Sequence, residues 1–124
     1  MNLLKDFYQV LSIDSSSPSE CVINLELNAK HPVYSGHFPG NPVLPGVCTL
    51  QIIKECAEAF WENPLQYTQI GSCKFLSAIN PVTHPKLTLM FSLNQQEENN
   101  FRLIAEGMAE ETPFIKLKAT VTKQ

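Results

Sequence analysis

The sequence predicts an α+β fold in which an antiparallel sheet wraps around one long apolar helix. The first observation is a stretch of residues, 47–62, that contains neither proline nor glycine. The second is a series of segments in which apolar and polar residues alternate, one before this stretch and four after it. Alternation with a period of two is typical of half-buried strands, so these segments are expected to form the sheet.

Before the long helix, the sequence predicts a short helix, a loop and a strand. Residues 2–11 carry apolar side chains near helical spacing, which predicts an amphipathic helix. Residues 14–19 read DSSSPS and predict a turn or loop. Residues 20–28 alternate, which predicts a half-buried strand. Its apolar face consists of Cys21, Ile23, Leu25 and Leu27.

The long helix is predicted over residues 47–62 and is expected to be mostly buried. Pro45 is tolerated next to its start because the first turn has no use for the missing amide hydrogen, and Asn63 and Pro64 end it. The apolar stripe is formed by Val47, Leu50, Ile53, Ala57 and Phe60 and widened by Ile52, Cys56 and Ala59. The remaining narrow side carries Gln51, Glu55, Glu58 and Glu62.

Four strands are predicted after the helix. They cover residues 67–79, 86–94, 101–110 and 114–123. The polar connections QQEENN and EETP predict hairpins between the last three. The sequence therefore predicts a run of antiparallel strands packed on one helix.

Length and composition favour a single globular unit. The chain has 124 residues, of which 44% are apolar and 17% charged, so a core can form and the charge density is too low for a disordered chain. The net charge of −3 and the scattered lysines argue against a nucleic-acid partner. No segment approaches the roughly 20 apolar residues of a membrane span. Lys5 and Asp6 interrupt the start that resembles a signal peptide, so we expect a cytoplasmic protein.

The cysteines and histidines do not predict a metal site. No CxxC pair occurs, and the three histidines are far apart in sequence. We expect the four cysteines to be small buried residues in a reducing compartment: Cys21, Cys48, Cys56 and Cys73.

His37 lies in SGHFPGNPVLPG, a loop of glycines and prolines that leads directly into the long helix. Free amide groups and the positive end of the helix dipole can bind a developing oxyanion at such a helix start. A neutral imidazole beside them could act as a general base near pH 7. Composition alone leaves a second interpretation open, in which His37 caps or packs within a connecting loop.

The segment GHFPGNPVLPGV resembles the signature of the 3-hydroxyacyl-(acyl carrier protein) dehydratases of fatty-acid biosynthesis, which adopt the hotdog fold. The resemblance covers roughly residues 20–122, because the strand, loop, long helix and the segment IGSCKFLSAINPV follow in the family's order. We therefore expect a single hotdog domain over residues 1–124. Residues 1–19 would form an N-terminal helix and loop, and residues 20–124 the core.

The resemblance implies a dimer whose active site forms between subunits at the helix starts, without cofactor or metal. By this resemblance, His37 removes the α-proton of a 3-hydroxyacyl thioester, and the backbone amide of Gly46 polarises the thioester carbonyl. Val47 would also contact substrate. Tyr34 and Phe38 are apolar enough to line an acyl tunnel, although packing in the core or the dimer interface explains them equally well.

The sequence departs from the family at Gln51, where the family carries a helix glutamate or aspartate that helps the 3-hydroxyl leave. An amide can form hydrogen bonds but cannot donate a proton as an acid does. Glu55 lies one helical turn later, where relatives often carry glutamine. It either reaches the pocket or belongs to the polar side of the helix.

Three functions remain open. The first is a dehydratase in which His37 returns the proton to the leaving hydroxyl while Gln51 orients that hydroxyl. The second is a non-catalytic hotdog subunit that pairs, as a heterodimer, with an active dehydratase carrying the acid. The third is a hotdog acyl thioesterase, which normally needs a carboxylate and lacks this loop.

An acyl carrier protein is strongly acidic, so its docking surface should offer basic residues. Lys74 lies where the family often places one, but the second basic residue usual there is absent. Coenzyme A thioesters remain alternative substrates. The homodimer and the heterodimer both remain open.

Overall fold

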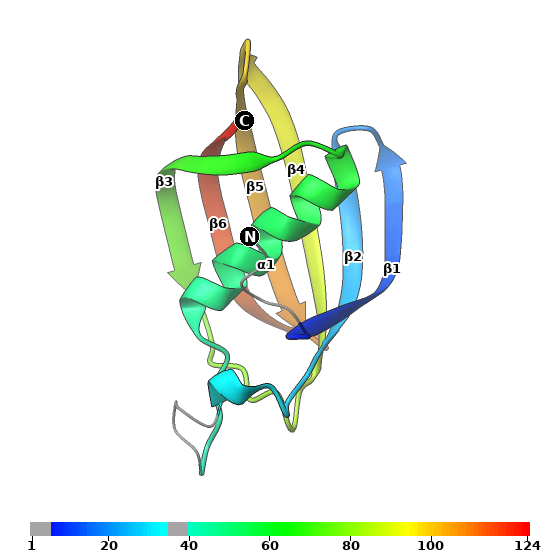
Figure 1. Ribbon diagram of the computed structural model, residues 1–124, viewed down its shortest axis with the longest axis vertical. Helices are drawn as coiled ribbons and strands as arrows, with labels where there is room; N and C mark the ends of the chain where they lie inside the picture. Colours follow the sequence, from blue (N-terminus) through cyan, green and yellow to red (C-terminus); the bar gives the residue numbers. More distant parts are fainter. Residues whose placement is uncertain (1–5, 35–39) are drawn as a thin grey trace.

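Helix α1 (Gly46–Trp61) lies across one face of a six-stranded antiparallel sheet (Figure 1). The computed structural model describes residues 6–34 and 40–124. The strands are β1 (Tyr8–Ser17), β2 (Glu20–Leu27), β3 (Leu65–Phe75), β4 (Lys86–Glu97), β5 (Asn100–Ala109) and β6 (Thr112–Lys123), and a short 3-10 helix covers Pro32–Tyr34. Their order across the sheet is β1-β2-β4-β5-β6-β3. The predicted α+β architecture, one helix against an antiparallel sheet, is confirmed.

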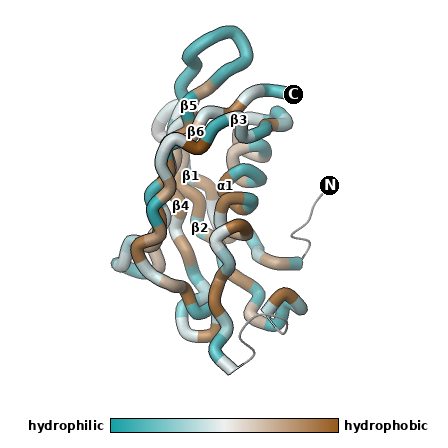
Figure 2. The backbone as a smooth tube through the Cα atoms, turned by 90° about the vertical axis from the view of Figure 1, so that its left-hand side faces the viewer, coloured by the Kyte–Doolittle hydropathy of each residue, from teal (hydrophilic) through white to brown (hydrophobic). Residues whose placement is uncertain are grey.

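The core lies between α1 and the sheet. On β2 the predicted apolar face is buried, and the side chains of Ile52, Ile53, Cys56 and Ala57 meet it from the helix. Figure 2 shows the apolar residues of the strands and of α1 gathered in this layer, whereas the hairpin between β4 and β5 is hydrophilic. Because β2, β4, β5 and β6 alternate between buried and more exposed residues, one face of the sheet covers the helix and the other faces away from it.

The beginning of the described chain differs from the prediction. The helix predicted over residues 2–11 is wrong for residues 8–11, which start β1, while residues 1–5 lie outside the described part. The loop predicted over 14–19 is also wrong for residues 14–17, which continue β1. Pairing with β2 from Tyr8 to Ser17 decides this segment, so tertiary contacts override the local pattern.

Val47 was predicted to belong to the buried stripe, and this prediction is wrong because 76% of its surface is exposed. It lies in the first turn of α1, where its neighbours Cys48 and Thr49 face the core and Val47 points away from it. Strand β3 ends at Phe75 rather than near residue 79. All four thiols are free, and the predicted burial is confirmed for Cys21, Cys48 and Cys56, whereas Cys73 is half-buried.

Strands β1 and β3 form the two edges of the sheet. β3 begins just after the helix ends and runs back beside it, so that its last residue, Phe75, lies next to the helix start (Figure 1). This return brings the beginning of α1, the end of β3 and the segment after Phe75 together.

Candidate active site

The start of α1 has two amide groups without an acceptor among the described residues. Pro45 is the N-cap residue with extended backbone angles, and no side chain caps the helix. The amides of Cys48 and Thr49 donate to the Pro45 carbonyl at 3.0 and 3.2 Å. Among the described residues no acceptor is recorded for the amides of Gly46 and Val47. Two backbone donors at the positive end of the helix dipole can therefore hold an oxygen that gains negative charge.

An exposed apolar patch borders these donors. The ring of Phe75 lies against Gly46. A Cβ atom at position 46 would lie 2.8 Å from Cζ of Phe75, so the ring can occupy this position only because residue 46 is glycine. Phe75 is 51% exposed, and Leu76 and Val47 beside it are exposed as well. A chain that buries most of its apolar side chains exposes such a group where another surface or a ligand is bound.

Gln51 and Glu55 are brought together on α1, as their spacing predicts. Nε2 of Gln51 donates to Oε2 of Glu55 at 2.9 Å, and the hydroxyl of Tyr8 on β1 donates to Oε1 of the same carboxylate at 3.0 Å. Both oxygens of Glu55 are thus engaged by donors. All three side chains are half-buried.

These side chains border an open groove of about 520 Å³ that runs along the side of α1 turned away from the sheet. Lys54 and Glu58 also line it and form an i,i+4 ion pair at 3.8 Å. Glu58 accepts the amide of Leu65 at 2.8 Å, so its carboxylate fixes the chain as it enters β3. On this side of α1, Glu58 is thus engaged by Lys54 and by the Leu65 amide, whereas Glu55 is the carboxylate bound to Gln51.

Tyr34 packs in the core just before the signature loop. It is 4% exposed, and its ring stacks on Phe7 with centroids 5.6 Å apart. Its hydroxyl is buried and has no hydrogen-bond partner in residues 6–34 and 40–124, and burial raises the pKa of this phenol well above its ordinary value. Packing accounts for the ring, and a role in substrate binding stays a prediction. His37 and Phe38 lie outside the described residues.

Lys74 lies on the face of the sheet opposite α1. It is exposed and pairs in register with Lys116 of β6, and Lys118 follows on the same face. Within residues 6–34 and 40–124 neither Lys74 nor Lys116 forms an ion pair within 4.0 Å, although Glu106 of β5 pairs in register with Lys116 on the same face. Like charges directly opposite each other destabilise a sheet.

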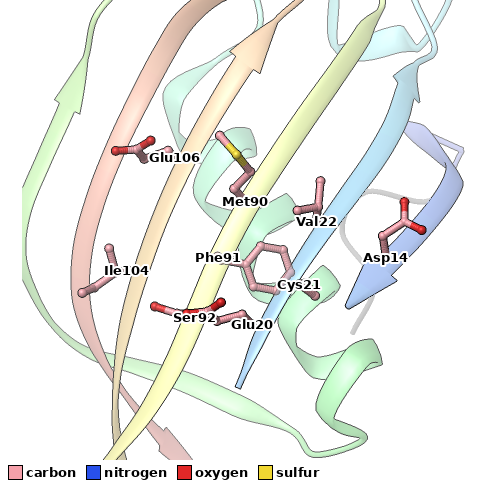
Figure 3. A pocket seen from close by; sticks show the side chains of 9 residues that line it. All are labelled: Asp14, Glu20, Cys21, Val22, Met90, Phe91, Ser92, Ile104 and Glu106. Carbon is pink, nitrogen blue, oxygen red and sulfur yellow. The ribbon is translucent and has the colours of Figure 1, made fainter. Parts of the chain in front are cut away.

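A further hollow of about 340 Å³ lies on the same outer face, over β2, β4 and β5 (Figure 3). Met90, Val22 and Ile104 form its apolar floor, and carboxylates stand at its rim. The sheet separates this hollow from α1, so it belongs to a different surface from the helix start.

Tyr8 is a residue of this site that the sequence prediction missed. Tyr8 was missed because residues 2–11 were expected to form a helix, whereas Tyr8 begins β1. A strand at this position would have placed Tyr8 beside the long helix, but the apolar neighbours Val10 and Leu11 obscure the alternation.

Within residues 6–34 and 40–124, no cluster of three or more His, Cys, Asp or Glu side chains has a geometry that could hold a metal ion. No helix among the described residues is long and apolar enough to cross a membrane.

The sequence matches a family of known proteins over most of its length. The model of the ApeI-like family, described as ApeI dehydratase, matches residues 13–112. The 3-hydroxyacyl-[acyl-carrier-protein] dehydratase FabZ of Lactobacillus helveticus is 27% identical over 124 residues, covering 90% of this chain and 81% of FabZ. FabZ of Bartonella bacilliformis is 25% identical, with 93% of this chain and 79% of that protein covered.

Solved structures agree on the fold. A chain of the dehydratase heterocomplex ApeI:P from Xenorhabdus doucetiae superposes with a TM-score of 0.78 at 19% identity, covering 92% of this chain and 96% of that one. A hypothetical thioesterase with coenzyme A from Streptococcus pneumoniae superposes with a TM-score of 0.67 at 12% identity, covering 98% and 90%. At such identities the likeness shows the hotdog fold, which dehydratases and thioesterases share.

Proposed function

The chain belongs to the ApeI-like dehydratase family, and from this premise we propose that it eliminates water from a 3-hydroxyacyl thioester to give a 2-enoyl thioester. The observation that carries the proposal is the pair of amides of Gly46 and Val47, for which the described residues supply no acceptor, at the helix start that follows the signature loop. They are placed to polarise a thioester carbonyl, which acidifies the neighbouring C2–H bond.

His37 is proposed as the base. Its imidazole takes the C2 proton, the electrons of that bond form the C2–C3 double bond, and the C3–O bond breaks. The leaving hydroxide takes the proton back from the imidazolium and departs as water. One residue thus moves one proton, and no cofactor enters the balance.

Gln51 is proposed to orient the 3-hydroxyl. An acid placed there would protonate the leaving group directly, and its absence is expected to slow the step by about 10²-fold or more. The amide of Gln51 nevertheless forms directional hydrogen bonds. We therefore expect slow but measurable turnover.

The experiment measures reversible hydration of a short 2-enoyl thioester by the purified protein, followed by loss of the enoyl absorbance. Turnover by the wild-type chain supports the proposal. If the wild type is inactive and Gln51→Glu gains activity, the site of this chain alone is degenerate and the enzymatic proposal fails.

A second candidate is a subunit that completes the site of a partner hotdog protein. Gln51 in the position of the acid favours it, and the relative of TM-score 0.78 comes from a dehydratase heterocomplex. Here a partner subunit would supply the missing acid to His37. Gain of activity on mixing with a second hotdog protein, without activity of either alone, would support this candidate over the first. A thioesterase has no comparable observation in its favour.

Assembly is proposed to occur through β3. This edge strand has no strand partner on its outer side, and it carries exposed Ile70 and Phe75, with Val47 of the helix beside its end. Unpaired, apolar edge strands are ready templates for pairing with another chain. A homodimer or a heterodimer formed there would cover this apolar patch and enclose the helix start.

The substrate is proposed to arrive on an acyl carrier protein, with coenzyme A thioesters as alternative substrates. Lys74, Lys116 and Lys118 form a basic row on the outer face, in which Glu106 of β5 pairs in register with Lys116, although the chain has a net charge of −3. Lys74 directly precedes Phe75, whose ring contacts Gly46, so this row reaches the edge of the sheet at the end of β3 that adjoins the helix start, and an acidic partner bound to the row would extend to that edge.

A further inference from the structure

Three side chains form a chain of hydrogen bonds between β1 and α1. The hydroxyl of Tyr8 donates to Oε1 of Glu55 at 3.0 Å, and Nε2 of Gln51 donates to Oε2 of Glu55 at 2.9 Å. One carboxylate therefore receives donors from two different elements of the fold. Hydrogen bonds to an ionised acceptor are the stronger kind, so this arrangement restricts all three side chains.

The carboxylate decides which way the Gln51 amide faces. An ionised carboxylate only accepts, so the NH2 group of Gln51 must be the end that turns to Glu55. The carbonyl oxygen, Oε1, is then the end that turns away. No donor to this oxygen is recorded among the residues the structure describes. Gln51 thus offers an acceptor to whatever binds beside it.

Tyr8 is well suited to anchor Glu55. It pairs with Leu27 in the β1–β2 register and follows Phe7, which is fully buried. Burial first, and then the nearby Cys56 and Glu55, raise the pKa of Tyr8 well above its ordinary value. The phenol therefore keeps its proton and remains a donor.

We propose that Tyr8 and Glu55 are positioning residues, which hold the Gln51 amide so that its carbonyl oxygen accepts a hydrogen bond from the 3-hydroxyl of the thioester. This inference rests on the proposed function and deepens it. With the hydroxyl hydrogen on Gln51, the lone pairs of the hydroxyl oxygen are left to receive the proton from the imidazolium of His37. The departing water then carries its own hydrogen and the returned C2 proton.

The structure provides a matched control. Tyr67 on β3 also donates a hydroxyl hydrogen to α1, to the Leu50 carbonyl at 2.9 Å, on the other flank of the helix. Tyr67→Phe removes the same atom as Tyr8→Phe but leaves Glu55 and Gln51 untouched. Circular dichroism of both variants reports whether either has lost its fold.

The first measurement is binding, made in a His37→Ala background so that the ligand is not turned over. The ratio of affinities for 3-hydroxybutyryl-CoA and butyryl-CoA isolates the contribution of the 3-hydroxyl. We expect the hydroxy form to bind about tenfold more tightly. Tyr8→Phe and Gln51→Leu should bring this ratio close to one, whereas Tyr67→Phe should preserve it. A ratio unchanged in Tyr8→Phe would overturn the inference.

The second measurement does not depend on substrate. The side-chain NH2 signals of Gln51 in a 1H–15N spectrum, assigned by their loss in Gln51→Leu, report how the amide is held. Their shifts should change in Tyr8→Phe and in Glu55→Ala but not in Tyr67→Phe. If they change as expected and neither thioester binds, the positioning stands and the proposed function fails. If they do not respond to Tyr8→Phe, the positioning fails whatever the activity.

Discussion

Oε2 of Glu55 lies 2.9 Å from Nε2 of Gln51, one helical turn away on α1. The acid and the amide of this helix are therefore in direct contact, in the reverse order to that implied by the resemblance to the dehydratases. The contact links the chemistry of the site to the edge strand β1, through the second bond from Tyr8 to the same carboxylate.

Exchanging the two residues should raise activity. In the double variant Gln51→Glu/Glu55→Gln, the amide at position 55 can donate to the new carboxylate and accept from Tyr8, so the hydrogen bonds are kept. An acid then stands where the leaving group needs one, and kcat should rise by about tenfold or more. Steady-state hydration of an enoyl thioester measures this.

The single variants serve as controls for that exchange. Gln51→Glu alone places two carboxylates one turn apart with no donor between them, so its gain should be smaller. Glu55→Gln alone adds no acid and should give none. A double variant no faster than the wild type would show that position 51 is not where protonation limits the reaction.

Alanine substitution of Gly107 and of Gly46 should destabilise the fold to different extents, because the ring against Gly107 is buried and the ring against Gly46 is half-exposed. In Gly107→Ala the new Cβ would meet Cζ of Phe114 at 2.7 Å, and Phe114 is 1% exposed. This overpacking should lower the free energy of unfolding by about 1–3 kcal/mol. In Gly46→Ala the ring of Phe75 is half-exposed and can swing away, so the change should stay below about 1 kcal/mol. Urea unfolding compares the two, and equal losses would contradict this account.

Buried thiols should make the fold less stable at alkaline pH. Burial raises the pKa of Cys56 from 9.0 to about 11, and that of Cys21 from 9.0 to about 12. The unfolded chain therefore releases these protons at lower pH than the folded chain. Stability should fall as the pH rises from about 9 towards 11 or 12 and be unaffected by these thiols below that window.

Cys56→Ala isolates one thiol. Between about pH 8 and pH 10.5 the wild type should lose about 2 kcal/mol more unfolding free energy than this variant, measured by urea denaturation at each pH. An identical alkaline loss in both proteins would mean that Cys56 titrates at the same pH in the folded and unfolded chain.

Charge reversal on the outer face should distinguish carrier-bound from free thioesters. Lys74→Glu and Lys116→Glu should raise KM for an acyl carrier protein substrate by about tenfold, and leave KM for the coenzyme A thioester within about twofold. Lys123→Glu is the matched control, since Lys123 lies at the opposite end of β6 and pairs with Leu65. Equal effects of all three variants on both substrates would rule out this surface as the docking site.

The sequence predicts the helix and five of the six strands because each carries a strong period. β2 and α1 each pack one face against the same core. Their apolar residues therefore recur with the period of a strand or of a helix, which can be detected in the sequence. β1 was missed because it is an edge strand whose apolar residues Val10, Leu11 and Ile13 are all exposed. A strand without a buried face shows no alternation of apolar and polar residues. In this segment the apolar residues also lie near helical spacing, which led to the prediction of a helix.

The site was only partly predictable for a related reason. The one-turn spacing of Gln51 and Glu55 predicts that they share a face of α1, and the structure joins them. Tyr8 lies 47 residues from Glu55 in sequence, so only the tertiary fold could bring it to the carboxylate. The exposure of Val47 likewise depends on which face of α1 meets the sheet, and the buried face runs through Cys48, Ile52 and Cys56 instead.

Hydration of a 2-enoyl thioester in D2O decides whether the chain is a dehydratase in which His37 moves the proton. The wild-type protein is expected to form a 3-hydroxyacyl thioester carrying one deuterium at C2, seen by mass spectrometry. His37→Ala is expected to form none above the uncatalysed rate. Turnover with C2 deuteration that persists in His37→Ala would contradict the assignment of the base, and no turnover by the wild type would contradict the dehydratase itself.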